Sequence, residues 1–253
     1  MVEKIVKTVY EAGKIILNAG KDKNVKEKTS NVDLVTEFDV RVQNFLFENL
    51  KKDFKNCTFL SEEGKENKTL EDGYCFIIDP IDGTTNFVKD FGHSAISVAL
   101  AKDKEIVAGV VYDPFLNNMF YAEKGKGAFL NDEKIHASNC EMENSLVLFG
   151  TCPYNHELAD DTFETAKKIF LNCIEVRRCG SAALDICYVA SGKADLYFEY
   201  VLRPWDYAAG TLILEEAGGI SMTLDKDTLT FDKNSSYLCG NKKNIDEFFK
   251  IIK

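Results

Sequence analysis

The stretch Asp79-Pro80-Ile81-Asp82-Gly83-Thr84-Thr85-Asn86-Phe87 carries the strongest information about the fold and its chemistry. It follows the apolar run 74–78, which predicts a buried strand that ends at an Asp79-Pro80 turn. Pro80 stiffens this turn, and Gly83 permits a close approach of the backbone before a predicted helix. The two aspartates can then point into one pocket beside the N–H groups of residues 83–85. Carboxylate oxygens suit Mg²⁺ and free N–H groups suit phosphate, so the stretch predicts a metal-plus-phosphate site.

An ordinary turn would also explain these two aspartates, because aspartate often caps a helix or stabilises a bend. Three other segments favour the metal site. They are Ser61-Glu62-Glu63-Gly64 after an apolar run, Trp205-Asp206 before Tyr207-Ala208-Ala209-Gly210, and the polar run 28–39. Taken singly, each has a structural explanation: solvated loop charges, a helix N-cap at Asp206, and a polar loop before a helix.

Length and composition indicate a globular protein of one large domain or two small ones. The chain has 253 residues, of which 45% are hydrophobic and 28% charged. It carries 31 basic and 41 acidic residues, a net charge of −10, which gives no broad attraction to nucleic acid or an anionic membrane. An acidic chain that acts on phosphates needs a cation between its carboxylates and the substrate. Apart from Lys28 and a distant arginine, we expect no side-chain cation at the phosphate.

The eight cysteines and three histidines predict neither a zinc site nor a disulfide scaffold. No C-x-x-C pair occurs, and His93, His136 and His156 lie far apart in sequence. The cysteines are too scattered for a small secreted scaffold. The N-terminal residues 1–18 lack the uninterrupted apolar core of a signal peptide. We therefore expect reduced thiols in a cytoplasmic protein.

Hydrophobic spacing predicts an α+β or layered α/β arrangement in one compact unit. Residues 1–18 form one expected helix, with Ile5, Val9 and Ile16 on its apolar face. A second expected helix spans 38–50, and Thr36 with Asp39 resembles a capping box at its start. The remaining expected elements are strands at 94–101, 106–112, 119–122 and 195–200, a turn at 124–127, and helices at 161–170, 181–190 and 206–217.

Together these segments resemble the inositol monophosphatase family of Mg²⁺-dependent, lithium-sensitive phosphatases. Residues 79–87 match its central signature, 205–210 its C-terminal signature, and 33–39 with 62–63 its supporting motifs. The resemblance covers nearly the whole chain. It implies a layered αβαβα sandwich of the sugar-phosphatase type, as a single phosphatase domain over 1–253. Residues 1–140 would form its metal and phosphate half, residues 141–253 its substrate half, and the protein would be a homodimer.

The same resemblance assigns the site residues. The implied metal ligands for two or three Mg²⁺ ions are the side chains of Glu62, Asp79, Asp82 and Asp206 and the carbonyl of Ile81. The implied catalytic residues are Thr84, Asp39 and Glu62, with Asp39 orienting the Thr84 hydroxyl near the attacking water. The implied phosphate and substrate contacts are Gly83, Thr84, Ser181, Ala182, Glu199 and Lys28. Cations would also offset the repulsion among four clustered carboxylates.

The expected function is hydrolysis of a small-molecule phosphate monoester, with inositol 1-phosphate as the first candidate, by attack of metal-activated water. Fructose 1,6-bisphosphate, NADP and 3′-phosphoadenosine 5′-phosphate remain alternatives. The last is less favoured, because Thr85-Asn86 stands where its phosphatases tend to carry Lys-Glu. A non-catalytic metal- or phosphate-binding regulator is disfavoured by the complete set of ligands. A paired-carboxylate glycosidase would have no use for a phosphate-binding helix start. No nucleic acid or membrane partner is expected.

Overall fold

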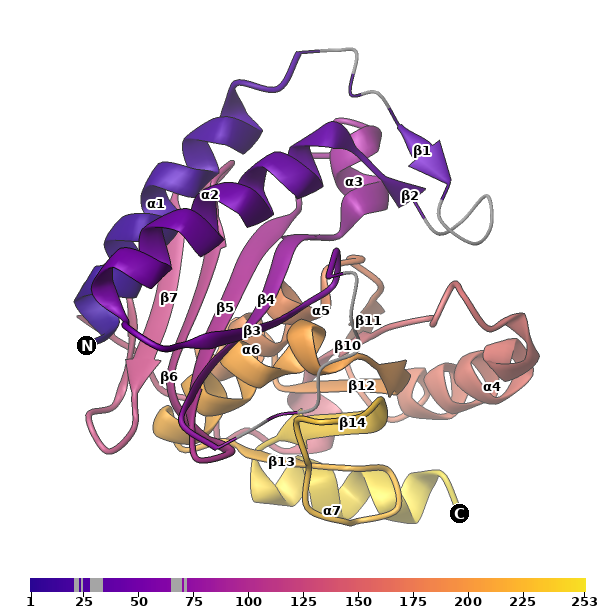
Figure 1. Cartoon of the computed structure of the whole chain (residues 1–253). Helices are drawn as coiled ribbons and strands as arrows, with labels where there is room; N and C mark the ends of the chain where they lie inside the picture. Colours follow the sequence, from indigo (N-terminus) through magenta and orange to yellow (C-terminus); the bar gives the residue numbers. More distant parts are fainter. Residues whose placement is uncertain (21–22, 24, 28–33, 65–69, 71) are drawn as a thin grey trace.

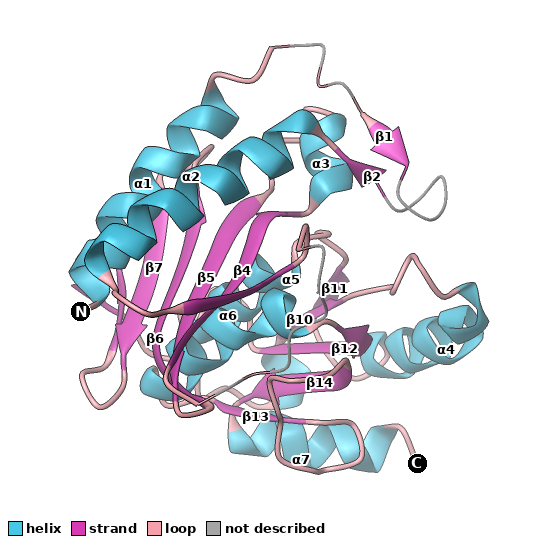
Figure 2. Ribbon diagram, in the orientation of Figure 1, coloured by secondary structure: helices cyan, strands magenta, loops and turns pink. Residues whose placement is uncertain are grey.

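The computed structural model describes residues 1–20, 23, 25–27, 34–64, 70 and 72–253. Their helices and strands form five layers in the order helix, sheet, helix, sheet, helix (Figures 1 and 2). This arrangement confirms the αβαβα sandwich that the sequence predicts. A two-stranded antiparallel sheet of β1 (Lys26–Glu27) and β2 (Leu34–Val35) lies apart from the two main sheets.

The first main sheet has seven strands in chain order. They are β3 (Thr58–Ser61), β4 (Tyr74–Asp82), β5 (Ala95–Lys102), β6 (Glu105–Asp113), β7 (Asn118–Glu123), β8 (Ala128–Leu130) and β9 (Glu133–Lys134). Every neighbouring pair is antiparallel except β3 and β4, which run parallel. The predicted strands 94–101, 106–112 and 119–122 are thus confirmed as a meander.

Helices α1 (Val2–Leu17) and α2 (Glu37–Asp53) cover the outer face of this sheet. Ile5, Val9 and Ile16 are buried in the core between them and the sheet, as the helical spacing predicts. The predicted capping box at Thr36 and Asp39 is also present. It satisfies N–H groups at the start of α2 and so fixes where this helix begins.

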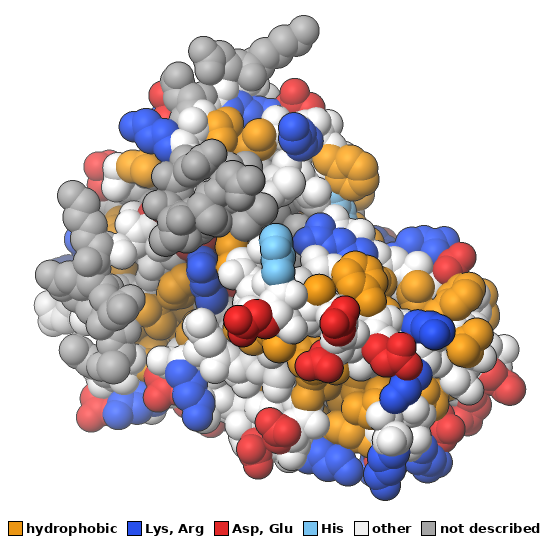
Figure 3. All heavy atoms as spheres, turned by 90° about the vertical axis from the view of Figure 1, so that its right-hand side faces the viewer, with side chains coloured by type: hydrophobic (Ala, Val, Ile, Leu, Met, Phe, Trp, Pro, Cys, Tyr) orange, Lys and Arg blue, Asp and Glu red, His pale blue; other side chains and the backbone are white. Residues whose placement is uncertain are grey.

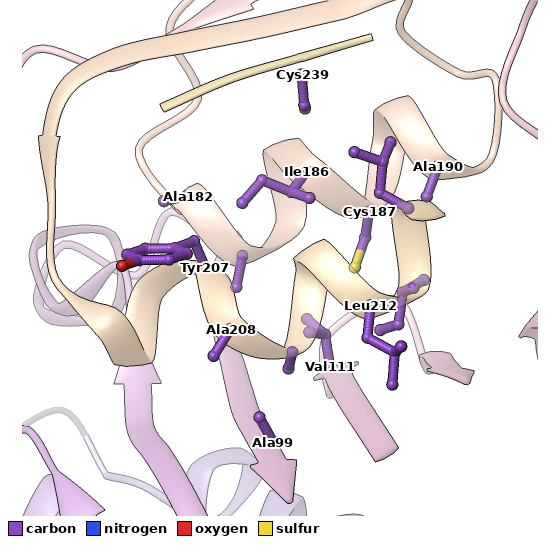
Figure 4. Close-up of a cluster of buried hydrophobic side chains, with 14 of the residues drawn as sticks. Ala99, Val111, Ala182, Ile186, Cys187, Ala190, Tyr207, Ala208, Leu212 and Cys239 are labelled. Atoms are coloured by element: carbon purple, nitrogen blue, oxygen red, sulfur yellow. The ribbon is translucent and has the colours of Figure 1, made fainter. Parts of the chain in front are cut away.

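Helices α5 (Ala182–Ala190) and α6 (Pro204–Glu216) form the central layer between the two sheets. Figure 4 shows their buried side chains, with Ile186 and Cys187 on α5 and Ala208 and Leu212 on α6. Helix α6 packs so closely against β6 that a Cβ atom at Gly109 would lie only 2.6 Å from the carbonyl oxygen of Ala209. Glycine at 109 therefore lets α6 touch the sheet with its backbone.

The second main sheet has the strand order β11 (Glu175–Arg177), β10 (Leu146–Phe149), β12 (Leu196–Leu202), β14 (Ser235–Gly240) and β13 (Ile220–Met222). Helices α4 (Ala159–Phe170) and α7 (Lys242–Ile251) cover its outer face. Ile169 and Phe248 join these helices to Phe198 of the sheet in a third core. Short 3₁₀ turns, Met142–Asn144 and His156–Leu158, lie in the connections.

The face that carries α4 exposes hydrophobic side chains among charged ones (Figure 3). Phe163 and Phe170 of α4, and Leu171 and Ile174 just after it, are among the exposed large hydrophobic residues. Within the described part of the chain, every helix is too short or too polar to cross a membrane.

Two boundaries differ from the sequence predictions. Strand β4 does not end before the Asp79-Pro80 turn but continues to Asp82. Its pairing with β5 shifts register between Asp79 and Asp82, and such an irregularity tolerates a proline that cannot donate a ladder hydrogen bond. Asp206 is not the N-cap of its helix, because α6 begins at Pro204 with Arg203 as the N-cap. Proline at the first helical position accounts for this earlier start.

Candidate active site

The register shift at the end of β4 places both aspartates of the signature in one pocket. Asp79 and Asp82 are 3% and 8% exposed, and both line this pocket. Asp79 Oδ1 accepts a hydrogen bond from the backbone N–H of Ile81 at 2.9 Å. Asp82 Oδ2 accepts from the Ser181 hydroxyl and, at 2.8 Å, from the N–H of Ala183. The first turn of α5 therefore holds the second aspartate in place.

Gly83 turns the chain from β4 into the short helix α3 (Thr84–Val88). Its φ of 84° lies in the left-handed region that favours glycine. A Cβ atom there would lie 3.0 Å from the carbonyl oxygen of Gly180 and 3.2 Å from that of His93. Glycine is thus required both by its conformation and by the approach of two other segments.

Glu62 and Asp206 come to the same pocket from other elements. Strands β3 and β4 are parallel with Ser61 opposite Ile78, so Glu62, just after β3, lies beside the end of β4. Asp206 lies in the first turn of α6, where its Oδ2 accepts from the N–H of Arg203 at 2.8 Å. The four predicted ligand side chains therefore meet around one pocket of about 100 Å³.

Burial and mutual repulsion both disfavour the ionised forms of the carboxylates in this pocket. Burial, and then the charges of Glu62 and Asp82, raises the pKa of Asp79 well above its usual range. Burial raises the pKa of Asp82 to about 7, although its bonds to Ser181 and Ala183 favour the anion. Removal from water, and then the charge of Asp82, raises the pKa of Asp206 well above its usual range.

This donor set fits divalent cations. Four carboxylates that repel one another within a small polar pocket are stabilised when cations lie among them. All of the donors are oxygens, the ligand type that Mg²⁺ prefers. The Ile81 carbonyl, the fifth predicted ligand, belongs to the same segment, and Ile81 also lines the pocket.

The hydroxyl of Thr84 has a partner other than the predicted one. It donates to the Ile81 carbonyl at 3.1 Å, and no hydrogen bond joins it to Asp39 in the described residues. Asp39 instead accepts from the N–H and hydroxyl of Thr36 through Oδ2. Its other oxygen, Oδ1, is buried and has no hydrogen-bond partner in the described part of the chain. Burial raises the pKa of Asp39 to about 7.

The opposite wall of the pocket holds the predicted substrate contacts Ser181, Ala182 and Glu199. Glu199 is 7% exposed and accepts from the N–H of Cys152 at 2.8 Å and from the hydroxyl of Tyr197 at 2.5 Å. A Cβ atom at Gly150 would lie 1.8 Å from its Oε2, so glycine provides the space for this carboxylate. Lys28, the remaining predicted contact, lies outside the described residues.

Sequence reasoning missed two arginines in the pocket lining, Arg178 and Arg203. Arg203 forms an ion pair with Glu62, with Nη1 and Oε1 3.3 Å apart. Arg178 donates from Nε to the Thr151 hydroxyl at 3.2 Å. The sequence analysis allowed for a distant arginine beside Lys28 without identifying it, and the structure places these two arginines at the pocket. Arg178 stands directly before the segment 179–182, and this adjacency to predicted substrate contacts was the available signal.

Comparisons with known proteins agree with this geometry. The family model described as "Inositol monophosphatase family" matches residues 1–252. The Nus factor SuhB of Escherichia coli K12 is 36% identical over 224 residues, which are 87% of this chain and 84% of that protein. Inositol monophosphatase 2 of Saccharomyces cerevisiae is 39% identical over 206 residues, 77% of this chain and 70% of that protein.

A solved structure supports the same assignment. The IMPase of Thermotoga maritima superimposes with a TM-score of 0.89 at 32% sequence identity. The match covers 99% of this chain and 95% of that chain. The likeness therefore extends over both sheets and all three helical layers.

Proposed function

The chain belongs to the inositol monophosphatase family, and we propose that it is a Mg²⁺-dependent phosphate monoesterase. The observation that carries this proposal is the meeting of Glu62, Asp79, Asp82 and Asp206 around one pocket, next to the Gly83 turn. Two or three Mg²⁺ ions held by these side chains and by the Ile81 carbonyl would supply positive charge for the phosphate oxygens and make a water molecule more acidic.

The chain's own residues then bind and orient the reactants. Backbone N–H groups at Gly83 and Thr84 are the proposed phosphate contacts. The Thr84 hydroxyl donates a hydrogen bond to the Ile81 carbonyl, so the lone pairs of its oxygen are available to accept a hydrogen bond from the attacking water. In this geometry Ile81, rather than Asp39, orients that hydroxyl. Asp39 supports the site from the start of α2.

Inositol 1-phosphate is the substrate that we propose. Glu199 has both oxygens in hydrogen bonds, yet it lines the pocket and has lone pairs for the hydroxyls of a polyol. Ser181 and Ala182 lie beside it at the start of α5. The yeast relative that carries the name inositol monophosphatase 2 supports this choice. Arg178 in the lining favours fructose 1,6-bisphosphate, with its second phosphate, among the alternatives.

Removal of the metal tests the proposed function directly. We expect exhaustive chelation to abolish phosphate release, and Mg²⁺ to restore it, whereas K⁺ at matched ionic strength should not. Li⁺ added with Mg²⁺ should inhibit. Undiminished turnover in a metal-free sample would contradict the metal-dependent mechanism. Metal binding without turnover on any phosphate ester would favour the alternative function, a non-catalytic metal- or phosphate-binding regulator. The name of the Escherichia coli relative, Nus factor SuhB, supports that alternative.

A panel of phosphate esters tests the substrate. We expect kcat/KM to be higher for inositol 1-phosphate than for fructose 1,6-bisphosphate, NADP or 3′-phosphoadenosine 5′-phosphate. Arg178→Gln sharpens this test, because it should lower kcat/KM for the bisphosphate much more than for inositol 1-phosphate. A preference for the bisphosphate in the unmodified protein would reassign the substrate and leave the reaction class intact.

We propose that the protein forms a homodimer. Four large hydrophobic side chains are exposed on and just after α4, namely Phe163, Phe170, Leu171 and Ile174. Exposed hydrophobic side chains of this kind can be covered by a second copy of the chain. Light scattering coupled to gel filtration should give twice the mass of one chain. A mass of one chain at micromolar concentration would exclude a stable dimer.

A further inference from the structure

A mixed cluster of ligand-type side chains lies beside the pocket. One nitrogen of His93, the sulfur of Cys179 and one carboxylate oxygen of Asp185 all lie within 4.8 Å of one another. His93 precedes β5, Cys179 lies between β11 and α5, and Asp185 is in the first turn of α5. Three separate positions therefore bring an imidazole, a thiol and a carboxylate to one point.

The backbone at this cluster is fixed by a neighbour that is not part of it. The Asn86 side-chain amide donates to the carbonyl of His93 at 2.8 Å and to that of Cys179 at 2.9 Å. One side chain thus clamps the two loop segments side by side. The cluster is held together before any ligand binds, which lowers the entropy lost on binding.

Two polar atoms in the cluster are buried without hydrogen-bond partners among the described residues. They are Nε2 of His93 and Oδ1 of Asp185. Asp185 is 1% exposed, and the nearby carboxylates of Asp82 and Glu199 repel its charge. A buried carboxylate with a free oxygen is costly unless something binds to it. A cation would compensate both the missing bond and the repulsion.

We propose that His93, Cys179 and Asp185 bind one Zn²⁺ ion at a site distinct from the carboxylate centre. Imidazole nitrogen, thiolate sulfur and carboxylate oxygen are the ligand types of zinc, whereas Mg²⁺ takes oxygen ligands. Zinc bond lengths of roughly 2.0–2.3 Å place tetrahedral ligands about 3.5 Å apart, so the three side chains need to close by about 1 Å.

Access and proton balance are consistent with this site. Asp185 also lines the pocket, so an ion can reach the cluster from the pocket. Zinc binds the thiolate, and the Cys179 thiol therefore gives its proton to solvent as the Zn–S bond forms. Because Cys179 is two residues from Ser181, which holds Asp82, an ion here would also stiffen the support of the carboxylate centre.

Co²⁺ is the probe that tests the proposal, since a thiolate ligand gives bound Co²⁺ a near-ultraviolet charge-transfer band. The reduced full-length protein is first saturated with Mg²⁺ to occupy the carboxylate centre. We expect one equivalent of Co²⁺ to produce the band and Zn²⁺ to remove it. Absence of the band in this protein would overturn the proposal without the need for any variant.

Variants assign the band to the cluster. Cys179→Ser should abolish it, and the matched control Cys173→Ser, at another half-buried cysteine, should retain it. His93→Gln should keep the band but weaken Co²⁺ binding by about tenfold or more. Circular dichroism checks that each variant folds. A band that survives Cys179→Ser, or binding that His93→Gln leaves unchanged, would show that the three residues do not form the site.

Discussion

Two buried carboxylates on opposite walls of the pocket, Asp79 and Glu199, differ in how their oxygens are satisfied. On the wall built by the seven-stranded sheet, Asp79 accepts one hydrogen bond from the described residues, from the N–H of Ile81. On the wall built by the five-stranded sheet, both oxygens of Glu199 accept one, from Cys152 and Tyr197. Both side chains are buried, yet only Glu199 has a hydrogen-bond donor at each of its two oxygens among the described residues.

The surroundings of the two carboxylates also act differently on their pKa values. Burial raises the pKa of both, but the charges of Glu62 and Asp82 add to the effect at Asp79. At Glu199, the bonds from Tyr197 and Cys152 act in the opposite direction. This contrast supports the roles proposed above, in which Asp79 holds metal and Glu199 positions a neutral polyol.

The largest expected effect is the difference in kinetics between one substitution on each wall, at Asp79 and at Glu199. Asp79→Asn should lower kcat by on the order of a thousandfold, because it removes an anionic ligand from the metal centre. Glu199→Gln keeps the shape and an acceptor for the Cys152 N–H, so it should raise KM by only about tenfold. Steady-state kinetics at saturating Mg²⁺ measure both. If the two variants lost activity equally, and only through KM, the proposed division between the walls would be wrong.

A smaller effect is expected within the first wall, at Thr84. Thr84→Ala should lower kcat by on the order of a hundredfold, because the attacking water loses an orienting contact. Mg²⁺ affinity should hardly change, since the carboxylates remain. Thr84→Ser restores the hydroxyl and should recover most of the rate. An alanine variant that kept full kcat and lost only about 1 kcal/mol of stability would show that Thr84 merely serves the start of α3.

The smallest expected effect is on stability as a function of pH. The folded-state pKa values of Asp39 and Asp82 are raised to about 7, above those of unfolded aspartate. The folded protein therefore holds protons that the unfolded chain has released, and its stability falls as pH rises from about 4 to 7. Without metal we therefore expect a Tm that is several °C lower at pH 8 than at pH 5.

Mg²⁺ should reverse this trend if the first wall is the metal site. The ion binds the deprotonated carboxylates, so its stabilising effect should be larger at pH 8 than at pH 5. Glu199→Gln is the matched control and should show the same Mg²⁺ effect, whereas Asp79→Asn should show much less. Thermal scans with and without Mg²⁺ at both pH values decide this. A Tm that rises with pH in the metal-free protein would contradict the expected charge balance.

Local patterns predicted the parts of the fold that depend on local physics. The capping box at Thr36 and the buried face of α1 follow from short-range spacing, and both were confirmed. The predicted end of β4 was wrong, because proline normally ends a strand. Only the pairing with β5 shows the register shift that allows a proline in this strand. Asp206 was misplaced by a few residues, since an N-cap aspartate and one in the first turn give similar patterns.

The site was predictable where a signature carried it and not where only the tertiary structure brought residues together. Residues 79–87 indicated the metal wall, but nothing local showed that Arg203 pairs with Glu62, 141 positions away. The cluster at His93, Cys179 and Asp185 was missed for the same reason. Cysteine and histidine spacing argued against a zinc site, because such spacing detects only ligands that are close in sequence.

The contact between Gly109 and Ala209 has a consequence for which residues count as part of the site. Neither residue lines the pocket, yet the backbone of α6 rests directly on β6 at this point. A methyl group at 109 would push the helix that carries Asp206 away from the sheet that carries Asp79 and Asp82. The distance between the two halves of the carboxylate centre therefore depends on the absence of a side chain at residue 109, which lies outside the pocket lining.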